Sequence, residues 1–215
     1  MILNNAEIVT CPFCGKQKEL LSLISGNTFG AVLWSDGKQI APMLPKVSPV
    51  QKCPRCRKYY LYYNQPIKIA DHESFTTGDL SYQEWKEAFV QLNADPSLDN
   101  KDRSIIYMRL IQAFNDRYYR GPAPEIYTKE TTPPQEEYAF IVQVIDSFIA
   151  YAKWETPSAK LLKAELFREA GHFSQCRQTL QSIDPFCLDD SEHSLYSSIL
   201  SHATAHDHKV FQCPS

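Results

Sequence analysis

Glycine is scarce in this sequence. Only 7 of the 215 residues are glycine and none of them cluster, so the chain has no glycine-rich loop of the kind that cradles phosphates in nucleotide-binding proteins. The sequence also lacks Gly-x-Ser-x-Gly and His-Glu-x-x-His, the local motifs of many serine hydrolases and zinc proteases. We therefore expect a protein that is not an enzyme.

Long apolar runs are absent as well. No run approaches the roughly 20 residues that span a bilayer, and the first residues, Met-Ile-Leu-Asn-Asn-Ala-Glu, lack the basic and apolar regions of a signal peptide. Seven cysteines are few for a secreted disulfide-rich protein, and paired cysteines in a reducing compartment indicate metal ligands rather than disulfides. These features favour a cytoplasmic protein with no membrane partner.

Four of the cysteines form two Cys-x-x-Cys pairs, Cys11-Pro-Phe-Cys14 and Cys53-Pro-Arg-Cys56. Two intervening residues allow a tight turn to direct both sulfurs at one ion, and a second pair completes the tetrahedron of a structural Zn²⁺ site. Four protein ligands leave no open position for water or substrate. Iron is the alternative metal, because tetrahedral sulfur suits both ions.

The residues around the two pairs favour strands. Residues 1–10, 18–25 and 58–63 have strand character, and Asp36-Gly37 between the apolar segments 31–34 and 39–40 predicts a hairpin with a type I′ turn. Residues 8–65, with Cys11, Cys14, Cys53 and Cys56, resemble the zinc-ribbon (rubredoxin-like) family. The resemblance implies a small β module held by a metal and says little about its biological role.

The second cysteine pair lies in a basic, tyrosine-rich segment that contains Lys52, Arg55, Arg57, Lys58, Tyr59, Tyr60, Tyr62 and Tyr63. Such residues pair with phosphates and stack on bases in nucleic-acid-binding proteins. Alternatively, the tyrosines pack within the ribbon and the charges are solvated and offset the thiolates. Residues 1–70 carry nine Lys/Arg and three Asp/Glu, but the whole chain has a net charge of −3, so nucleic acid is the less favoured partner.

Helical periodicity begins near residue 81. Ser81 and Glu84 form a capping-box pattern, and further helices are expected at about 101–119, 135–154 and 190–206, with a proline-rich connection at 121–134. Between residues 164 and 180 the order Ala164, Phe167, Gly171, Phe173, Cys176 resembles the tetratricopeptide helix–turn–helix, which implies two closely packed helices. One such unit is present, whereas a free-standing solenoid needs at least three.

Histidines near the C-terminus form a second candidate group. His202 and His206 are spaced i, i+4 on one helix face and His208 follows them, so they could hold a metal, although a solvated helix end is the more common reason for such a cluster. His72 is expected in an exposed linker.

The sequence therefore predicts an α+β protein with a small β zinc ribbon at 1–70 and an all-α, tetratricopeptide-like helical-repeat domain at 71–215. This layout resembles bacterial proteins that pair cysteine knuckles with helical repeats, a resemblance that implies no particular activity. The expected function is that of a non-enzymatic adaptor, in which structural Zn²⁺ holds the ribbon and the helical domain binds a protein or peptide partner. The first alternative is a nucleic-acid-associated protein that uses the basic ribbon. The second is an enzyme that local motifs do not reveal, or a protein with a rubredoxin-like iron site.

Overall fold

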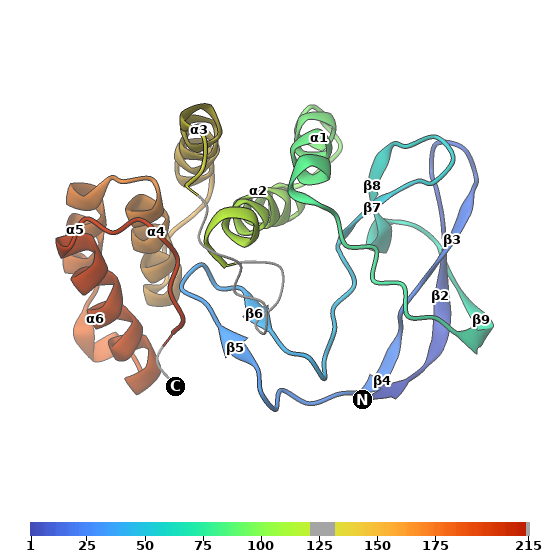
Figure 1. Cartoon of the computed structure of the whole chain (residues 1–215), viewed down its shortest axis with the longest axis horizontal. Helices are drawn as coiled ribbons and strands as arrows, with labels where there is room; N and C mark the ends of the chain where they lie inside the picture. Colours follow the sequence, from blue (N-terminus) through green and yellow to red (C-terminus); the bar gives the residue numbers. More distant parts are fainter. Residues whose placement is uncertain (121–131, 214–215) are drawn as a thin grey trace. The chain divides into compact units, whose positions relative to one another are not determined.

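A computed structural model describes residues 1–120 and 132–213 (Figure 1). Small antiparallel sheets lie in the N-terminal part and six α-helices follow within the described residues, which confirms the α+β class. The strands are β1 Ile2–Leu3, β2 Asn5–Thr10, β3 Gln17–Leu20, β4 Leu23–Ser25, β5 Val32–Leu33, β6 Gln39–Ile40, β7 Val50–Lys52, β8 Tyr59–Leu61 and β9 Ile67–Glu73. The helices are α1 Tyr82–Asn93, α2 Asn100–Asn115, α3 Gln135–Tyr151, α4 Pro157–Glu169, α5 Phe173–Gln181 and α6 Asp190–Thr204.

The chain divides into two compact units. The first comprises Met1–Ala31 and Ile40–Ile106, and the second comprises Val32–Gln39 and Tyr107–Ser215. The short hairpin between the two cysteine pairs therefore belongs to the helical unit, although its neighbours along the chain belong to the ribbon unit. These units differ in extent from the expected domains 1–70 and 71–215.

The first unit is built on the antiparallel sheet β3-β2-β9, with β7 and β8 forming a separate pair. Strand β9 occupies the segment that we expected to be a linker, and it pairs with β2 in a register that places Ile69 opposite Glu7. Six of its seven residues are exposed, so the strand lacks the alternation of buried and exposed residues that would have identified it. His72 lies on it, exposed as expected, with Nε2 3.1 Å from Glu19 Oε2.

Helix α1 begins where its capping residues predict. Ser81 accepts a hydrogen bond from the Glu84 backbone N–H, and the Glu84 side chain accepts one from the Ser81 N–H, so the capping box is confirmed. The helix contacts β8 through hydrogen bonds within the first unit. The Tyr59 hydroxyl donates to Glu87 at 2.6 Å, and the Gln91 amide donates to the Tyr59 carbonyl at 2.7 Å. Helix α1 thus depends on the ribbon strands for part of its packing.

The hairpin β5–β6 forms, but its turn is not type I′. A type I′ turn needs positive φ at two residues, whereas only Gly37 has one, at 73°. The Trp34 carbonyl accepts from the Gly37 N–H at 2.8 Å, and the Trp34 N–H donates to the Lys38 carbonyl at 2.9 Å. This is a type I turn followed by a left-handed glycine, and the Asp36 side chain accepts from the Lys38 N–H at 3.1 Å within it.

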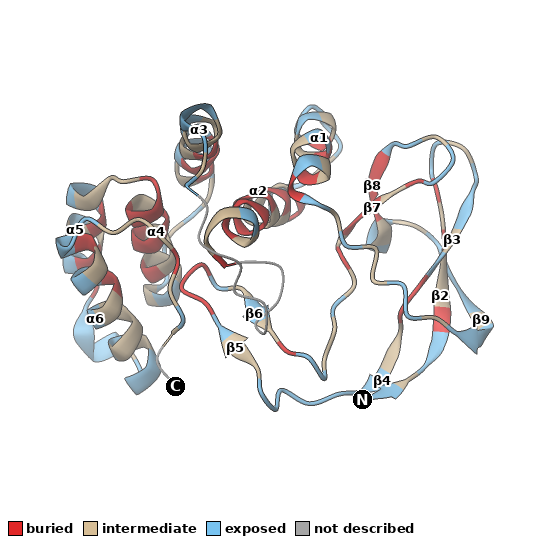
Figure 2. Ribbon diagram, viewed as in Figure 1, coloured by how far each residue is buried: buried red, intermediate tan, exposed pale blue. Residues whose placement is uncertain are grey.

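The helices after α1 match the expected segments, and α2, α3 and α6 have shorter C-terminal ends than expected. Helix α2 ends at Asn115 and a π-helical turn, Asp116–Arg120, replaces its predicted last turn. Most of the predicted proline-rich connection lies outside the described residues. Helices α4 and α5 form the predicted antiparallel pair, in which Ala164 and Cys176 are fully buried and Gly171 has φ 76°. Figure 2 shows the buried faces of α4 and α5.

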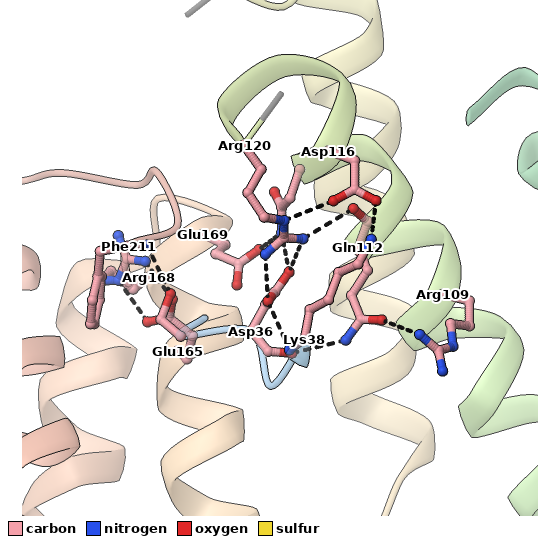
Figure 3. A network of polar contacts seen from close by, with 12 residues as sticks. Asp36, Lys38, Arg109, Gln112, Asp116, Arg120, Glu165, Arg168, Glu169 and Phe211 are labelled. Carbon is pink, nitrogen blue, oxygen red and sulfur yellow. Dashed lines mark hydrogen bonds and ion pairs between the residues drawn. The ribbon is translucent and has the colours of Figure 1, made fainter. Parts of the chain in front are cut away.

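A network of ionised and polar side chains is buried in the second unit (Figure 3). The Arg120 guanidinium donates to Asp36 Oδ1 and Oδ2, both at 2.8 Å, and its Nε donates to Asp116 at 2.7 Å. Asp36 and Arg120 are 0% and 2% exposed. Bidentate pairs of this kind are the strongest charge-assisted hydrogen bonds, so the hairpin is fixed to the turn that follows α2.

A second buried ion pair lies on α4, and Glu169 of the same helix joins this network through Asn115. Arg168 pairs with Glu165 within the helix, and Asn115 Nδ2 lies 3.0 Å from Asp36 Oδ2 and 2.8 Å from Glu169 Oε2. The other Glu169 oxygen has no hydrogen-bond partner among the described residues. Burial, together with the negative charges of Glu165 and Asp36, raises the pKa of Glu169 well above its ordinary value of 4.5.

Replacement Glu169→Gln is expected to increase stability at neutral pH. Because the folded protein binds the Glu169 proton more tightly than the unfolded chain, the stabilising contribution of the carboxyl is fully present below about pH 4.5 and is lost as pH rises toward the folded-state pKa. Over that window the wild type should lose about 1.4 kcal/mol per pH unit relative to the glutamine variant. Urea unfolding of both proteins from pH 4 to pH 8 measures this difference.

The exposed Glu155 provides the matched control. Glu155→Gln should change the free energy of unfolding at neutral pH by less than about 0.5 kcal/mol. Parallel stability curves for the wild type and Glu169→Gln would contradict the assignment of a raised pKa to Glu169.

Candidate metal centre

The first cysteine pair lies in a tight turn that continues strand β2. The Cys11 N–H donates to the Lys16 carbonyl at 2.9 Å, and the Cys11 carbonyl accepts from the Gly15 N–H at 3.0 Å. Gly15 has φ 71°, a conformation that glycine adopts at little cost. The turn thereby brings the Cys11 and Cys14 sulfurs to the same side of the chain.

The second pair repeats this geometry after strand β7. The Cys53 N–H donates to the Lys58 carbonyl at 2.9 Å, and the Cys53 carbonyl accepts from the Arg57 N–H at 3.0 Å. Arg57 occupies the position equivalent to Gly15 and has φ 60°. A non-glycine residue in this conformation is uncommon. The sequence alone did not reveal it, because an arginine gives no indication of a positive φ, whereas the glycine at the equivalent position of the first turn does.

The two turns bring all four predicted ligands together. The four sulfurs lie within 4.8 Å of one another, with Cys11 Sγ 3.7 Å from Cys56 Sγ and Cys14 Sγ 3.5 Å from Cys53 Sγ. Zn–S bonds of about 2.3 Å in a tetrahedron place the sulfurs about 3.8 Å apart. The cluster therefore has the ligand types, number and spacing of a four-thiolate metal site.

The environment of the sulfurs suits a bound cation. Cys11 and Cys53 are 2% and 1% exposed, and they pack with Val9, Leu20 and Tyr60. Burial opposes ionisation of Cys53, but the N–H groups of Cys56 and Arg55 donate to its sulfur and lower its pKa to about 6. Burial raises the pKa of Cys11 to about 12. A metal that binds here must therefore displace protons, and the backbone N–H groups favour the thiolate form.

The basic and aromatic residues of the second knuckle have different environments. Lys52 Nζ lies 3.0 Å from Glu84 and 3.7 Å from Glu87, so its charge is compensated within the unit. Arg55, Arg57 and Lys58 are exposed. Tyr59 and Tyr60 are each 3% exposed, which leaves them unable to stack on a base without rearrangement. Of the remaining tyrosines, Tyr62 is half-buried and Tyr63 is 38% exposed.

The three C-terminal histidines are not brought together as metal ligands in the described residues, where the four cysteines are the one group with suitable geometry. His202 Nδ1 lies 2.8 Å from Asp207 Oδ2. The His206 ring contacts Phe173, and the His208 ring lies between Tyr119 and Tyr138. His202 and His206 do not share a helix face, because α6 ends at Thr204 and His206 has φ 56°.

No helix among the described residues has the length and apolar character required to cross a membrane. No family model matches this chain, and no match to it was found among curated proteins or among solved structures. The four-cysteine cluster is thus the candidate site that the geometry itself supports.

Proposed function

We propose that this protein is a non-enzymatic adaptor in which a structural Zn²⁺ ion holds the ribbon unit and the helical unit binds a protein or peptide partner. The observation that carries the metal assignment is the closed set of four cysteine sulfurs within 4.8 Å of one another. Four thiolates satisfy tetrahedral Zn²⁺ and leave no position for a substrate. The ion therefore stabilises the fold and performs no chemistry on a substrate.

The helical unit supports the partner role through its architecture. Helices α4 and α5 pack closely at Ala164 and Cys176, and α6 joins them in one hydrophobic core. The closely packed pair, with Gly171 at its turn, has the residue pattern of a tetratricopeptide unit, and helical repeats of this kind bind extended peptides on their concave face. We assign the partner site to this unit on that ground.

Elemental analysis of the protein purified without added metal tests the metal assignment. One zinc ion per chain is expected. One iron ion per chain would instead make the cluster a rubredoxin-like site, and a metal-free protein with four reactive thiols would contradict the assignment.

A peptide library displayed on phage tests the partner role. The immobilised full-length protein should enrich a common peptide motif, and binding of the enriched peptides should change little between 50 and 500 mM salt. Nucleic-acid binding would instead fall steeply with salt, and it would weaken in the variant Arg55→Ala/Arg57→Ala/Lys58→Ala. Failure to enrich any peptide motif would contradict the proposed function.

A further inference from the structure

The segment after α6 runs in an extended conformation along the hairpin of the helical unit. Gln212 forms an antiparallel bridge with Trp34. The Phe211 carbonyl accepts from the Ser35 N–H at 2.9 Å, and the Cys213 N–H donates to the Leu33 carbonyl at 2.8 Å. Residues 207–213 are here called the tail, and residues 211–213 of the tail thus add a short extended strand to β5 within the second unit.

One side chain of the tail, that of Phe211, packs on α4 and α6. The Phe211 ring stacks on the His202 imidazole, with centroids 4.2 Å apart and planes at 2°, and the Arg168 guanidinium lies 5.1 Å from the same ring (Figure 3). Phe211 also packs against the core of α4, α5 and α6. Val210 is 7% exposed. An aromatic residue is therefore the side chain of the tail that this surface accepts.

The remaining contacts use the main chain of the tail and the Asp207 side chain. Arg168 donates to the Asp207 carbonyl at 2.5 Å, and Asp207 accepts from the His202 side chain. Recognition by strand addition with pockets for a few side chains is a general mode of peptide binding, in which the main chain supplies affinity and the pockets supply specificity. The main-chain contacts of Asp207, Phe211 and Cys213 do not depend on the side chains of the tail.

We propose that the surface of β5, α4 and α6 that the tail covers, here called the groove, is the peptide-binding site of the helical unit and that the tail is its resident, displaceable ligand. The partner is an extended peptide with an aromatic residue, whose ring takes the place of Phe211 against His202 and Arg168. This inference rests on the proposed partner role of the helical unit. Because only Ala205 and His206 separate the tail from the end of α6 at Thr204, its effective concentration at the groove is high, on the order of millimolar, and it holds the site closed against weak ligands.

A fluorescent peptide with the sequence of residues 205–213, with serine in place of the cysteine, tests this proposal by anisotropy on the full chain. Phe211→Ala removes the ring that anchors the tail but leaves the groove, so the peptide is expected to bind this variant at least tenfold more tightly than it binds the wild type. The same peptide with alanine in place of phenylalanine should bind neither protein. Phe186→Ala, which removes a ring that is 98% exposed, should behave as the wild type.

A second variant keeps the test informative if Phe211→Ala does not fold. Cys213→Pro removes the N–H that donates to the Leu33 carbonyl and fixes the backbone at this position, and it should also increase peptide binding. Equal binding to the wild type and both variants, or none to any of them, would overturn the proposal, as would a dimer of the wild type that dissociates in Phe211→Ala, since the groove would then serve a second copy. If phage-enriched peptides bind the wild type and Phe211→Ala equally, the adaptor role survives and this groove is excluded.

Discussion

Under the proposed metal assignment, replacement Cys53→Ser is expected to reduce bound zinc from one ion per chain to nearly none and to unfold the ribbon. Cys53 is 1% exposed and its sulfur accepts two backbone N–H groups. Structural zinc contributes on the order of 10 kcal/mol to the folding of small modules, and the β strands around it are too short to replace that contribution. Elemental analysis and far-UV circular dichroism measure the two effects.

The amount of helical signal lost in Cys53→Ser follows from the division of the chain into two compact units. Helix α1 packs on the ribbon strands through Tyr59, Glu87 and Gln91, so its helical signal should be lost with the ribbon. Helices α3 to α6 belong to the second unit and should persist. Limited trypsin digestion should therefore cleave after Lys16 and Arg55.

The hairpin that joins the two halves of the ribbon should behave differently from its neighbours. Asp36 is held by Arg120 in the second unit, so cleavage at Lys38, which also pairs with Asp116, should stay slow in Cys53→Ser. Cys187→Ser, at an exposed cysteine, is the matched control and should keep one zinc ion and the wild-type digestion pattern. Loss of all helical signal in Cys53→Ser would show that the helical unit depends on the ribbon for folding.

Features set by neighbouring residues were predictable from the sequence. The two Cys-x-x-Cys turns place their own sulfurs, and the capping box of α1 is satisfied within four residues, so the ligand set and the start of the helix follow from local chemistry. The turn type of the hairpin could not be read in the same way. Asp36-Gly37 fits a type I′ turn as well as the observed one. The choice between them depends on the groups to which the Asp36 side chain is hydrogen-bonded, the Lys38 N–H and Arg120.

Features set by contacts between distant residues were not predictable. Asp36 and Arg120 are separated by 84 residues, and a lone aspartate in a turn gives no indication of a buried partner. Strand β9 is stabilised by pairing with β2 rather than by an apolar face. The segment around Phe211 has neither helical nor strand periodicity. The position of Phe211 depends instead on its contacts with His202 and Arg168. In each case the determining interaction joins segments that no local pattern connects.

Replacement Arg120→Met is expected to destabilise the second unit by about 3–5 kcal/mol, because it leaves the Asp36 carboxylate buried without its charged partner. The side chains of Arg120 and Asp36 are both fully buried, so water cannot replace the lost hydrogen bonds without opening the unit. Chemical denaturation followed by the helical signal measures the change. Arg117→Met, at an exposed position of the same turn, should change the free energy of unfolding by less than about 0.5 kcal/mol.

The double replacement Asp36→Asn/Arg120→Met separates the cost of an unpaired charge from the loss of packing. Asparagine keeps an oxygen that can accept from the Lys38 N–H and Asn115 but carries no charge, so the double variant should be more stable than Arg120→Met alone. Buried ion pairs commonly show this behaviour, since removing one partner is more harmful than neutralising both. A double variant less stable than Arg120→Met would mean that Asp36 acts through its own hydrogen bonds, and that the pair with Arg120 is secondary to them.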